Sequence, residues 1–255
     1  MDILDKFLDN AKASVAEGYY SVEESPSEKV SLREKLEKQF VIITEIKHAS
    51  PAGEYSYKTI DAGKAAMDFL ESGSDAISVV VEPKIFMGNL SNIPAAKKAG
   101  LPVLFKDFVI SDEQITAAKN TGADCMLLVV KALDRVGLDV DEMIGKAHKN
   151  GLEVLLESYD EAEMKRAMET DADVLGINNR DLQTLKVDIG RTERIMKAAG
   201  EINKPLISES GIKTADDVRF VKNVGAGGVL VGTAIWKADD LKAKIRELKQ
   251  GAADG

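Results

Sequence analysis

Short apolar segments rich in β-branched residues alternate along most of this chain with segments that carry one apolar helical face. Alternation of this kind indicates a parallel sheet, because its strands are covered on both faces and therefore read as continuous apolar runs. The apolar runs are Val41–Lys47, Ala76–Val81, Val103–Lys106, Met126–Lys131, Glu153–Glu157, Val174–Asn178, Leu206–Ser208 and Gly228–Val231. The helical segments are Thr59–Ser72, Ser91–Ala99, Ser111–Thr121, Val140–Asn150, Asp160–Thr170, Ile189–Ala199, Thr214–Val224 and Asp239–Gln250.

Eight such pairs predict a closed (β/α)8 TIM barrel, which fits the length of 255 residues. A doubly wound open sheet is the alternative, but no G-x-G-x-x-G follows the first strand. Before that strand lie two amphipathic pieces, Met1–Glu17 and Ser31–Lys38. We therefore expect a single domain, with an N-terminal helical extension over residues 1–40 and the barrel over residues 41–250.

The charge balance excludes several classes of partner. The chain has 34 Lys+Arg and 43 Asp+Glu, for a net charge of -9, which disfavours nucleic acid and an anionic membrane surface. The first residues are charged and no apolar run approaches the length of a membrane span, so we expect a cytoplasmic protein. A single cysteine, Cys125, allows no internal disulfide and is expected to be a buried thiol.

Charged and polar residues gather where the predicted strands end. Glu45 and Lys47 lie two positions apart in the first strand, so they share one face of the sheet. Because the carboxyl ends of barrel strands meet around one opening, the whole set predicts a shared site there. The residues in question are Glu45, Lys47, Lys106, Lys131, Glu157, Asn178, Arg180, Glu209 and Ser210.

The types of residue in this set indicate acid–base chemistry on an anionic ligand. Crowded lysines and carboxylates shift each other's pKa, which makes them usable as proton donors and acceptors. Arg180 can grip a carboxylate or phosphate with two parallel bonds, and Lys47 can act as a point charge. Gly211 and Gly232 follow the last two strands, where such barrels usually bind phosphate through backbone N–H groups.

Other mechanisms receive less support from the sequence. Two histidines, a lone cysteine and no compact carboxylate cluster give no reason to expect a metal ion. A Ser-His-Asp triad would need a G-x-S-x-G turn, which is absent. A Schiff base formed by Lys106 or Lys131 remains the main mechanistic alternative.

Seven blocks in order, "EIKHASP", "EPKIFMGN", "LFKDFVI", "LLESYDEAE", "GINNRDLQTL", "SESGI" and "GVLVGTAI", resemble the indole-3-glycerol-phosphate synthase family of tryptophan biosynthesis. The resemblance extends from about Ser31 to the end of the barrel. It implies a (β/α)8 barrel with an extra N-terminal helix, acting on 1-(2-carboxyphenylamino)-1-deoxyribulose 5-phosphate. The implied lyase reaction closes an indole ring and releases carbon dioxide and water without a cofactor. The implied partner is this small phosphorylated substrate alone, and a monomer is consistent with the sequence.

The resemblance also implies roles for individual residues. Lys106 would be the general acid at the substrate ketone, Glu157 the general base in dehydration with help from Glu45, and Lys47 an anion-binding residue that assists the acid. The implied substrate-binding residues are Ser50, Phe86, Lys131, Asn178, Arg180, Glu209 and Ser210. The implied phosphate-binding residues are Gly211, Gly232 and Thr233.

This chain departs from the usual family pattern at a few positions. After Lys47 it reads His48-Ala49-Ser50-Pro51-Ala52, where a second basic residue and a Ser-Pro-Ser are usual. Val81 replaces a threonine, and Ala234 replaces a serine in the last loop. These differences concern anion binding, so two alternatives stay open. One is another reaction on a phosphorylated sugar, and the other is a barrel that binds such a metabolite without converting it.

Overall fold

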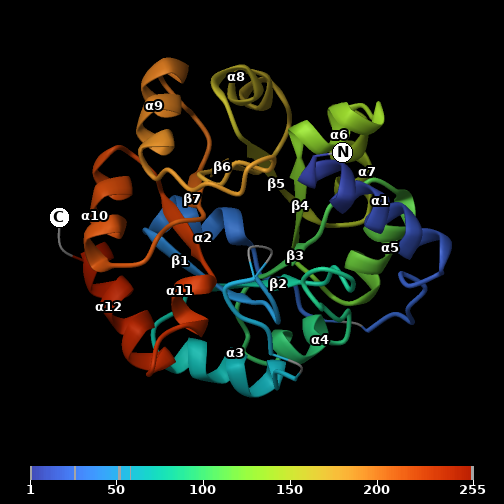
Figure 1. Cartoon of the computed structure of the whole chain (residues 1–255), viewed down its shortest axis with the longest axis horizontal. Coiled ribbons are helices and arrows are strands. Elements are labelled where there is room, and N and C mark those ends of the chain that lie inside the picture. Colours follow the sequence, from blue (N-terminus) through green and yellow to red (C-terminus); the bar gives the residue numbers. More distant parts are fainter. Residues whose placement is uncertain (1, 26, 51–52, 58, 254–255) are drawn as a thin grey trace.

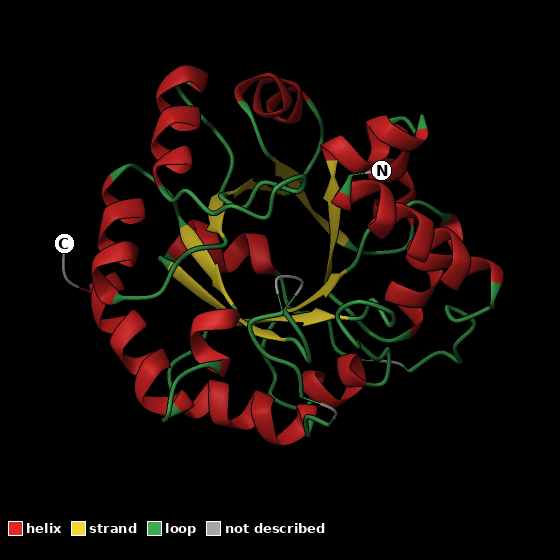
Figure 2. Cartoon of the chain, in the orientation of Figure 1, coloured by secondary structure: helices red, strands yellow, loops and turns green. Residues whose placement is uncertain are grey.

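The computed structural model of this protein describes residues 2–25, 27–50, 53–57 and 59–253. Its strands form a closed parallel barrel in which neighbours pair in chain order and β8 pairs with β1 (Figures 1 and 2). The (β/α)8 prediction is therefore confirmed. The strands are β1 (Val41–Ile46), β2 (Ala76–Val80), β3 (Val103–Lys106), β4 (Cys125–Val129), β5 (Glu153–Ser158), β6 (Val174–Asn178), β7 (Leu206–Glu209) and β8 (Gly228–Val231).

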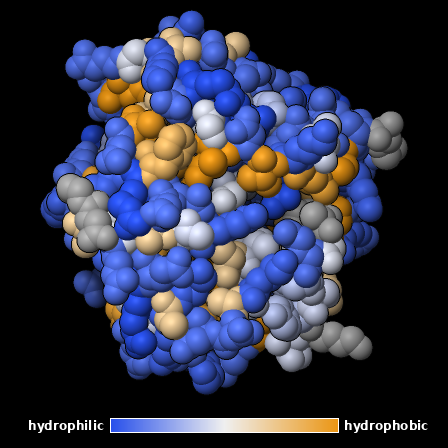
Figure 3. Space-filling model, turned by 60° about the vertical axis from the view of Figure 1, so that its left-hand side comes forward, coloured by the Kyte–Doolittle hydropathy of each residue, from blue (hydrophilic) through white to orange (hydrophobic). Residues whose placement is uncertain are grey.

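Helices surround the barrel, as Figure 1 shows, and the face of the molecule seen in Figure 3 is mostly hydrophilic. Within the described ranges, none is long and apolar enough to cross a bilayer. The helices are α1 (Ile3–Ala16), α2 (Leu32–Lys38), α3 (Ala62–Glu71), α4 (Asn92–Lys97), α5 (Asp112–Asn120), α6 (Val130–Val136), α7 (Val140–Lys149), α8 (Glu161–Glu169), α9 (Gly190–Ala199), α10 (Ala215–Asn223), α11 (Thr233–Trp236) and α12 (Leu241–Ala253).

The alternation of side chains along β1 explains how charge enters the barrel. Val41 and Ile43 belong to the apolar cluster inside the ring, whereas Ile42 and Ile46 belong to the cluster between the strands and the helices. Continuing this period of two places Glu45 on the inner face, at the carboxyl-terminal end of the strand. The same backbone regularity that builds the core therefore carries a carboxylate to the barrel opening.

The N-terminal helices reach both ends of the barrel. Leu32 and Leu36 of α2 join the inner apolar cluster at the amino-terminal ends of the strands. The start of α2 is held by Glu153, whose carboxylate accepts from the Leu32 N–H at 2.8 Å. On α1, Phe7 stacks on Phe108, just beyond β3, with 4.7 Å between ring centroids. These contacts support the prediction that residues 1–40 and 41–250 form one domain, which stays a prediction.

One boundary in the sequence analysis was wrong. The sequence predicts a strand over Met126–Lys131, but β4 ends at Val129 and α6 begins at Val130. Val130 and Leu133 are buried three positions apart, which is helical spacing, and Gly137 caps the end of α6 in a left-handed conformation. Two successive β-branched residues before Lys131 made the first turn of this helix look like strand.

A buried hydrogen bond ties the segment after α1 to the end of β3. The Tyr20 hydroxyl donates to Asp107 Oδ2 at 2.7 Å, and both residues are buried. Burial raises the pKa of Asp107 to about 7; the Tyr20 hydroxyl lowers it, and the charge of Glu82 adds to the rise. The hydrogen bond therefore favours the ionised form of Asp107.

We expect Tyr20→Phe to lower the free energy of unfolding by about 1–3 kcal/mol at pH 8, since it removes a donor from a buried carboxylate. Because the lost bond depresses the folded-state pKa of Asp107, its contribution is present above pH 7 and shrinks as the pH falls below that value. Urea unfolding at pH 8 and pH 5 measures both effects. In Tyr57→Phe, a control on a residue that is 41% exposed, we expect about 0.5 kcal/mol or less. Equal losses in the two variants would contradict the prediction.

Candidate active site

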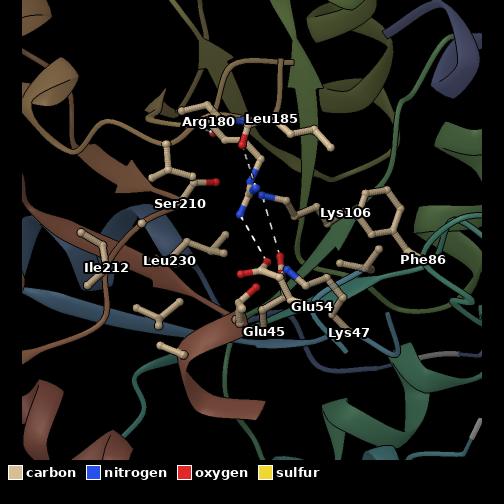
Figure 4. A pocket seen from close by; sticks show the side chains of 18 of the residues that line it. Glu45, Lys47, Glu54, Phe86, Lys106, Arg180, Leu185, Ser210, Ile212 and Leu230 are labelled. Carbon is tan, nitrogen blue, oxygen red and sulfur yellow. Dashed lines mark hydrogen bonds and ion pairs between the residues drawn. The ribbon is translucent and has the colours of Figure 1, made fainter. Parts of the chain in front are cut away.

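A cavity of about 880 Å³ is lined by residues at the carboxyl-terminal ends of the strands and in the loops that follow them. Figure 4 shows side chains from several strands pointing into this space. Five of the seven charged residues predicted for a shared site line it together. They are Glu45, Lys47, Lys106, Glu157 and Arg180, with Asn178 and Ser210 beside them.

Glu45 and Lys47 form an ion pair at the base of the cavity. Lys47 Nζ donates to Glu45 Oε1 at 2.5 Å, and Glu45 is 2% exposed. Burial by itself raises the pKa of Glu45, but the ammonium groups of Lys47 and Lys106 outweigh it and leave the pKa below its usual value. The carboxylate is therefore ionised at neutral pH. The two residues share a face because both look into the barrel opening.

Lys106, the last residue of β3, is surrounded by carboxylates. Its Nζ donates to Glu209 Oε2 at 2.5 Å and lies 3.9 Å from Glu45 Oε2. Burial lowers the pKa of Lys106, but Glu209, Glu45 and Glu157 outweigh that effect and raise it above its usual value. Lys106 is therefore an ammonium group at neutral pH, held in place and able to donate a hydrogen bond.

Glu157 on β5 has a carboxyl group whose pKa is raised close to neutrality. It is 3% exposed, and its Oε1 accepts from Asn178 Nδ2 at 2.9 Å. Burial and the nearby charge of Glu209 raise the pKa of Glu157 to about 8, although Lys106 acts in the opposite direction. A carboxyl group in this state can both take up and release protons near pH 8.

The segment after β6 supplies a guanidinium group. The Arg180 N–H donates to Asn178 Oδ1 at 2.9 Å, which fixes the start of the loop. Arg180 Nη1 donates to the Leu185 carbonyl at 3.1 Å, and Nη2 lies 3.9 Å from Glu54 Oε2. Ser210 follows β7 with φ of 65°, a left-handed conformation that is uncommon for a residue with a side chain.

Glycines after β7 and β8 line the other side of the cavity, together with Thr233 at the start of α11. Gly232 packs closely against the ion pair: a Cβ atom there would lie 2.4 Å from Glu45 Oε1 and 3.0 Å from Lys47 Nζ, so a side chain would displace these groups. Gly211 has φ of +88°, where a side chain would be strained. Both loops therefore present backbone to the cavity where the sequence predicts phosphate.

Three predicted site residues do not line the cavity directly. Glu209 is 1% exposed and lies beneath Lys106, to which it is hydrogen-bonded. Ser50 is buried and donates to Glu54 Oε2 at 2.8 Å. Lys131 lies on α6, with its Nζ 4.9 Å from the centroid of the Tyr159 ring. Its position outside the cavity gives no support to a role in substrate binding.

Several cavity residues were not anticipated from the sequence. Phe7 stacks against both Phe86 and Phe108, with centroid distances of 5.6 and 4.7 Å, so three rings form one aromatic wall. Glu54 also lines the cavity. Of these residues, only Phe108 lies close in the sequence to a predicted site residue, two positions after Lys106. Phe7 and Glu54 lie in segments whose sequence pattern does not indicate a place near the site.

The positions that depart from the family pattern lie in different surroundings. His48 is buried away from the cavity, where its Nε2 lies 3.0 Å from Asn92 Nδ2 of α4, and burial lowers its pKa. Val81 packs in the outer apolar cluster. Ala234 does line the cavity. Pro51 and Ala52 lie outside the described residues.

In the part of the chain that the structure describes, no group of three or more His, Cys, Asp or Glu residues could hold a metal ion. Cys125 is fully buried, and burial raises the pKa of its thiol well above the usual value. The thiol is therefore protonated, as the sequence predicted for a core cysteine.

Nearly the whole chain aligns with the sequences of known proteins. Residues 5–248 match the family model described as indole-3-glycerol phosphate synthase. An indole-3-glycerol phosphate synthase from Bacillus mycoides is 37% identical over 250 residues, covering 97% of this chain and 98% of that relative. One from a Bacillus cereus strain is 38% identical over 251 residues with the same coverage.

Solved structures with low sequence identity share the fold. A thiamine phosphate pyrophosphorylase from Pyrococcus furiosus aligns with a TM-score of 0.63 at 17% identity, covering 88% of this chain and 98% of that chain. An N-acetylmannosamine-6-phosphate 2-epimerase from Clostridium perfringens aligns with a TM-score of 0.61 at 16% identity, covering 89% and 96%. The family match and the close relatives are decisive: this chain belongs to the indole-3-glycerol phosphate synthase family.

Proposed function

We propose that this enzyme converts 1-(2-carboxyphenylamino)-1-deoxyribulose 5-phosphate into indole-3-glycerol phosphate, with Lys106 as the general acid and Glu157 as the general base. The observation that carries this proposal is the pairing of a buried ammonium group with a carboxyl group whose pKa is about 8, both facing one cavity. The cavity also has an aromatic wall and two glycine loops, which suit an aromatic ring and a phosphate group.

In the first step, the ring carbon that bears the carboxylate attacks the ketone carbon and forms the new C–C bond. Lys106 donates a proton to the ketone oxygen, which becomes a hydroxyl group. Lys47 lies close by, shares Glu45 with Lys106, and would assist through its positive charge. Positive charge aimed at an oxygen that becomes negative in the transition state is an effective form of catalysis.

In the next steps, the carboxylate leaves as carbon dioxide and its bonding electrons return to the ring system. The hydroxyl group then leaves as water, taking up a second proton that Lys47, the other ammonium group of the cavity, would donate. Glu157 removes the proton whose loss completes the indole ring. Glu157 is suited to this because burial has raised its pKa, which makes the ionised form a stronger base than a solvent-exposed carboxylate. Glu45, kept ionised by two lysines, would support these proton transfers by its charge.

The remaining residues would position the substrate. Phe86, with Phe7 and Phe108, would pack against the aromatic ring. Gly211, Gly232 and Thr233 would bind the phosphate. Asn178 would hold the sugar hydroxyl groups, and Glu209 would act through its hydrogen bond to Lys106. Arg180, Ser50 and Ser210 would bind the anionic ends of the substrate.

The mechanistic alternatives make different demands on these groups. A Schiff base needs a lysine with a neutral amine, and the raised pKa of Lys106 opposes that form. A protein that only binds the metabolite would not need a carboxyl group with a pKa near 8 beside an ammonium group. Both considerations favour acid–base catalysis.

The direct test is indole fluorescence from purified protein mixed with the carboxyphenylamino substrate, with no metal ion added. We expect fluorescence to grow, with a kcat of the order of 1–1000 per second that is usual for enzymes. Substrate that binds without forming product would identify a binding protein. Covalent trapping of the substrate on a lysine by borohydride would identify Schiff-base chemistry. Either result would overturn the proposal.

A further inference from the structure

A carboxylate of the protein itself lies at the cationic part of the cavity. Glu54, on the loop between β1 and α3, has one oxygen, Oε2, that accepts from Ser50 Oγ at 2.8 Å. The same oxygen lies 3.9 Å from Arg180 Nη2. Figure 4 shows Glu54 in the middle of the cavity, facing Arg180 across it. A hydroxyl donor and a guanidinium group thus converge on one carboxylate oxygen.

The ion pairs of the cavity differ in how firmly their acidic partner is held. Lys47 and Lys106 pair with Glu45 and Glu209, which are on β1 and β7 and are at most 2% exposed. Those carboxylates are part of the barrel wall. Among the described residues, the acidic partner of Arg180 is Glu54, which lies on a loop. Glu54 is therefore the carboxylate that can leave without disturbing a strand.

The same two donors are the ones proposed to bind an anionic end of the substrate. A ligand carboxylate with one oxygen between Ser50 Oγ and Arg180 Nη2 would occupy the place that Glu54 Oε2 now holds. The chemistry also matches, because Glu54 offers a planar group with two oxygens and one negative charge. A phosphate group is tetrahedral and has the glycine loops after β7 and β8 available to it.

We propose that Glu54 occupies the subsite for the aromatic carboxylate of the substrate in the ligand-free enzyme and exchanges with that carboxylate during turnover. This inference rests on the proposed function, because it assigns one end of that substrate to Arg180 and Ser50. The substrate must displace Glu54 to bind. Once the carboxylate has left as carbon dioxide, Glu54 can return to Arg180 while the product is still present.

The pair is loose enough for such an exchange. The distance of 3.9 Å exceeds that of a hydrogen bond, and the side chains are 17% and 34% exposed. Exposed ion pairs of this kind contribute little stability, so competition from Glu54 should weaken ligand binding only moderately. A weak hold on the carboxylate also suits decarboxylation, because a tight grip would stabilise the substrate more than the transition state that leads to carbon dioxide.

The test uses two ligands that cannot react, because the ketone of the substrate is reduced to an alcohol. One keeps the aromatic carboxylate and the other has hydrogen in its place, so that both retain the ring, the sugar chain and the phosphate. Dissociation constants are measured by calorimetry for the parent protein and for Glu54→Gln. We expect Glu54→Gln to bind the carboxylate ligand about two- to fivefold more tightly and the ligand without it unchanged.

A matched control separates competition from a general change of charge. Glu201→Gln removes one exposed carboxylate from the loop before β7, at the opposite end of the barrel, and should leave both dissociation constants unchanged. Equal tightening of both ligands by Glu54→Gln would mean that Glu54 repels the phosphorylated ligand as a whole. Unchanged or weaker binding of the carboxylate ligand would mean that Glu54 is no competitor. Either outcome overturns the exchange.

The binding test does not depend on turnover. If the parent protein binds both unreactive ligands and fails to form indole product from the substrate, the proposed reaction is wrong although the exchange can still be measured. If product forms and Glu54→Gln binds both ligands as the parent does, the reaction stands and the exchange is wrong.

Discussion

Replacing Lys106 with alanine should lower kcat by about 100- to 10,000-fold, the range expected when a general acid is removed. The Lys106 ammonium group is the donor that the geometry aims into the cavity from β3, held by Glu209 at 2.5 Å. Without it, the ketone oxygen gains no proton as the C–C bond forms, and three carboxylates are left facing each other. Steady-state formation of indole product at saturating substrate measures the effect.

Lys106→Arg separates proton transfer from charge. Arginine keeps the positive charge beside Glu209, but its delocalised guanidinium group is effectively never deprotonated in proteins, so it cannot pass a proton to the substrate. We expect this variant to retain substrate binding and to lose most of its kcat. Lys146→Ala, which changes a half-buried lysine paired with Glu142 and Asp112 outside the cavity, is the control and should match the parent. Full activity in Lys106→Arg would show that charge alone suffices.

Lys106 and Glu157 respond in opposite ways to the crowding of charges in the cavity. Crowding of lysines and carboxylates was expected to shift their pKa values toward neutrality. That is correct in direction for Glu157, whose pKa is raised, and wrong for Lys106, whose pKa moves further above neutrality. The sequence indicates that charged side chains lie close together. The direction of each pKa shift, however, depends on how many charged partners a group has and how deeply it is buried.

The fold could be predicted because it follows from local periodicity. Continuous apolar runs separated by amphipathic helical segments specify parallel strands covered on both faces, and eight of them close a barrel. The same period of two correctly placed Glu45 with Lys47 at the opening. The assignment failed at Val130–Val136, where β-branched residues continue from β4 into α6 and no Gly or Pro marks the change.

Contacts between distant segments could not be predicted. Phe7 meets Phe108 about a hundred positions later in the chain, and Glu54 meets Arg180 across the cavity. Periodicity assigns a residue to a face of its own helix or strand, but it does not say which loop or helix will pack opposite that face. The N-terminal part of the aromatic wall and the carboxylate at Arg180 therefore became visible only in three dimensions.

Glu157 should give the enzyme a rising pH dependence with an apparent pKa of about 8 in kcat/KM, which reports the free enzyme. Burial and the charge of Glu209 raise the pKa of Glu157, so most molecules carry the protonated form at neutral pH. If the ionised form is the base, activity increases as the pH rises through 8. At pH 7 it should be roughly tenfold below the plateau, since each unit below the pKa lowers the ionised fraction tenfold.

Glu157→Gln should remove this rising limb and lower kcat by about 100-fold or more, because glutamine retains the bond to Asn178 but cannot accept a proton. Profiles should be compared above pH 7, because the substrate phosphate itself titrates near pH 6. Glu169→Gln, at the exposed end of α8, should keep the parent profile. A parent activity that falls as the pH rises through 8 would mean that the protonated form of Glu157 is required. Glu157 would then act as an acid, donating the proton that lets water leave, and the general base would have to be sought in Glu45, which two lysines keep ionised.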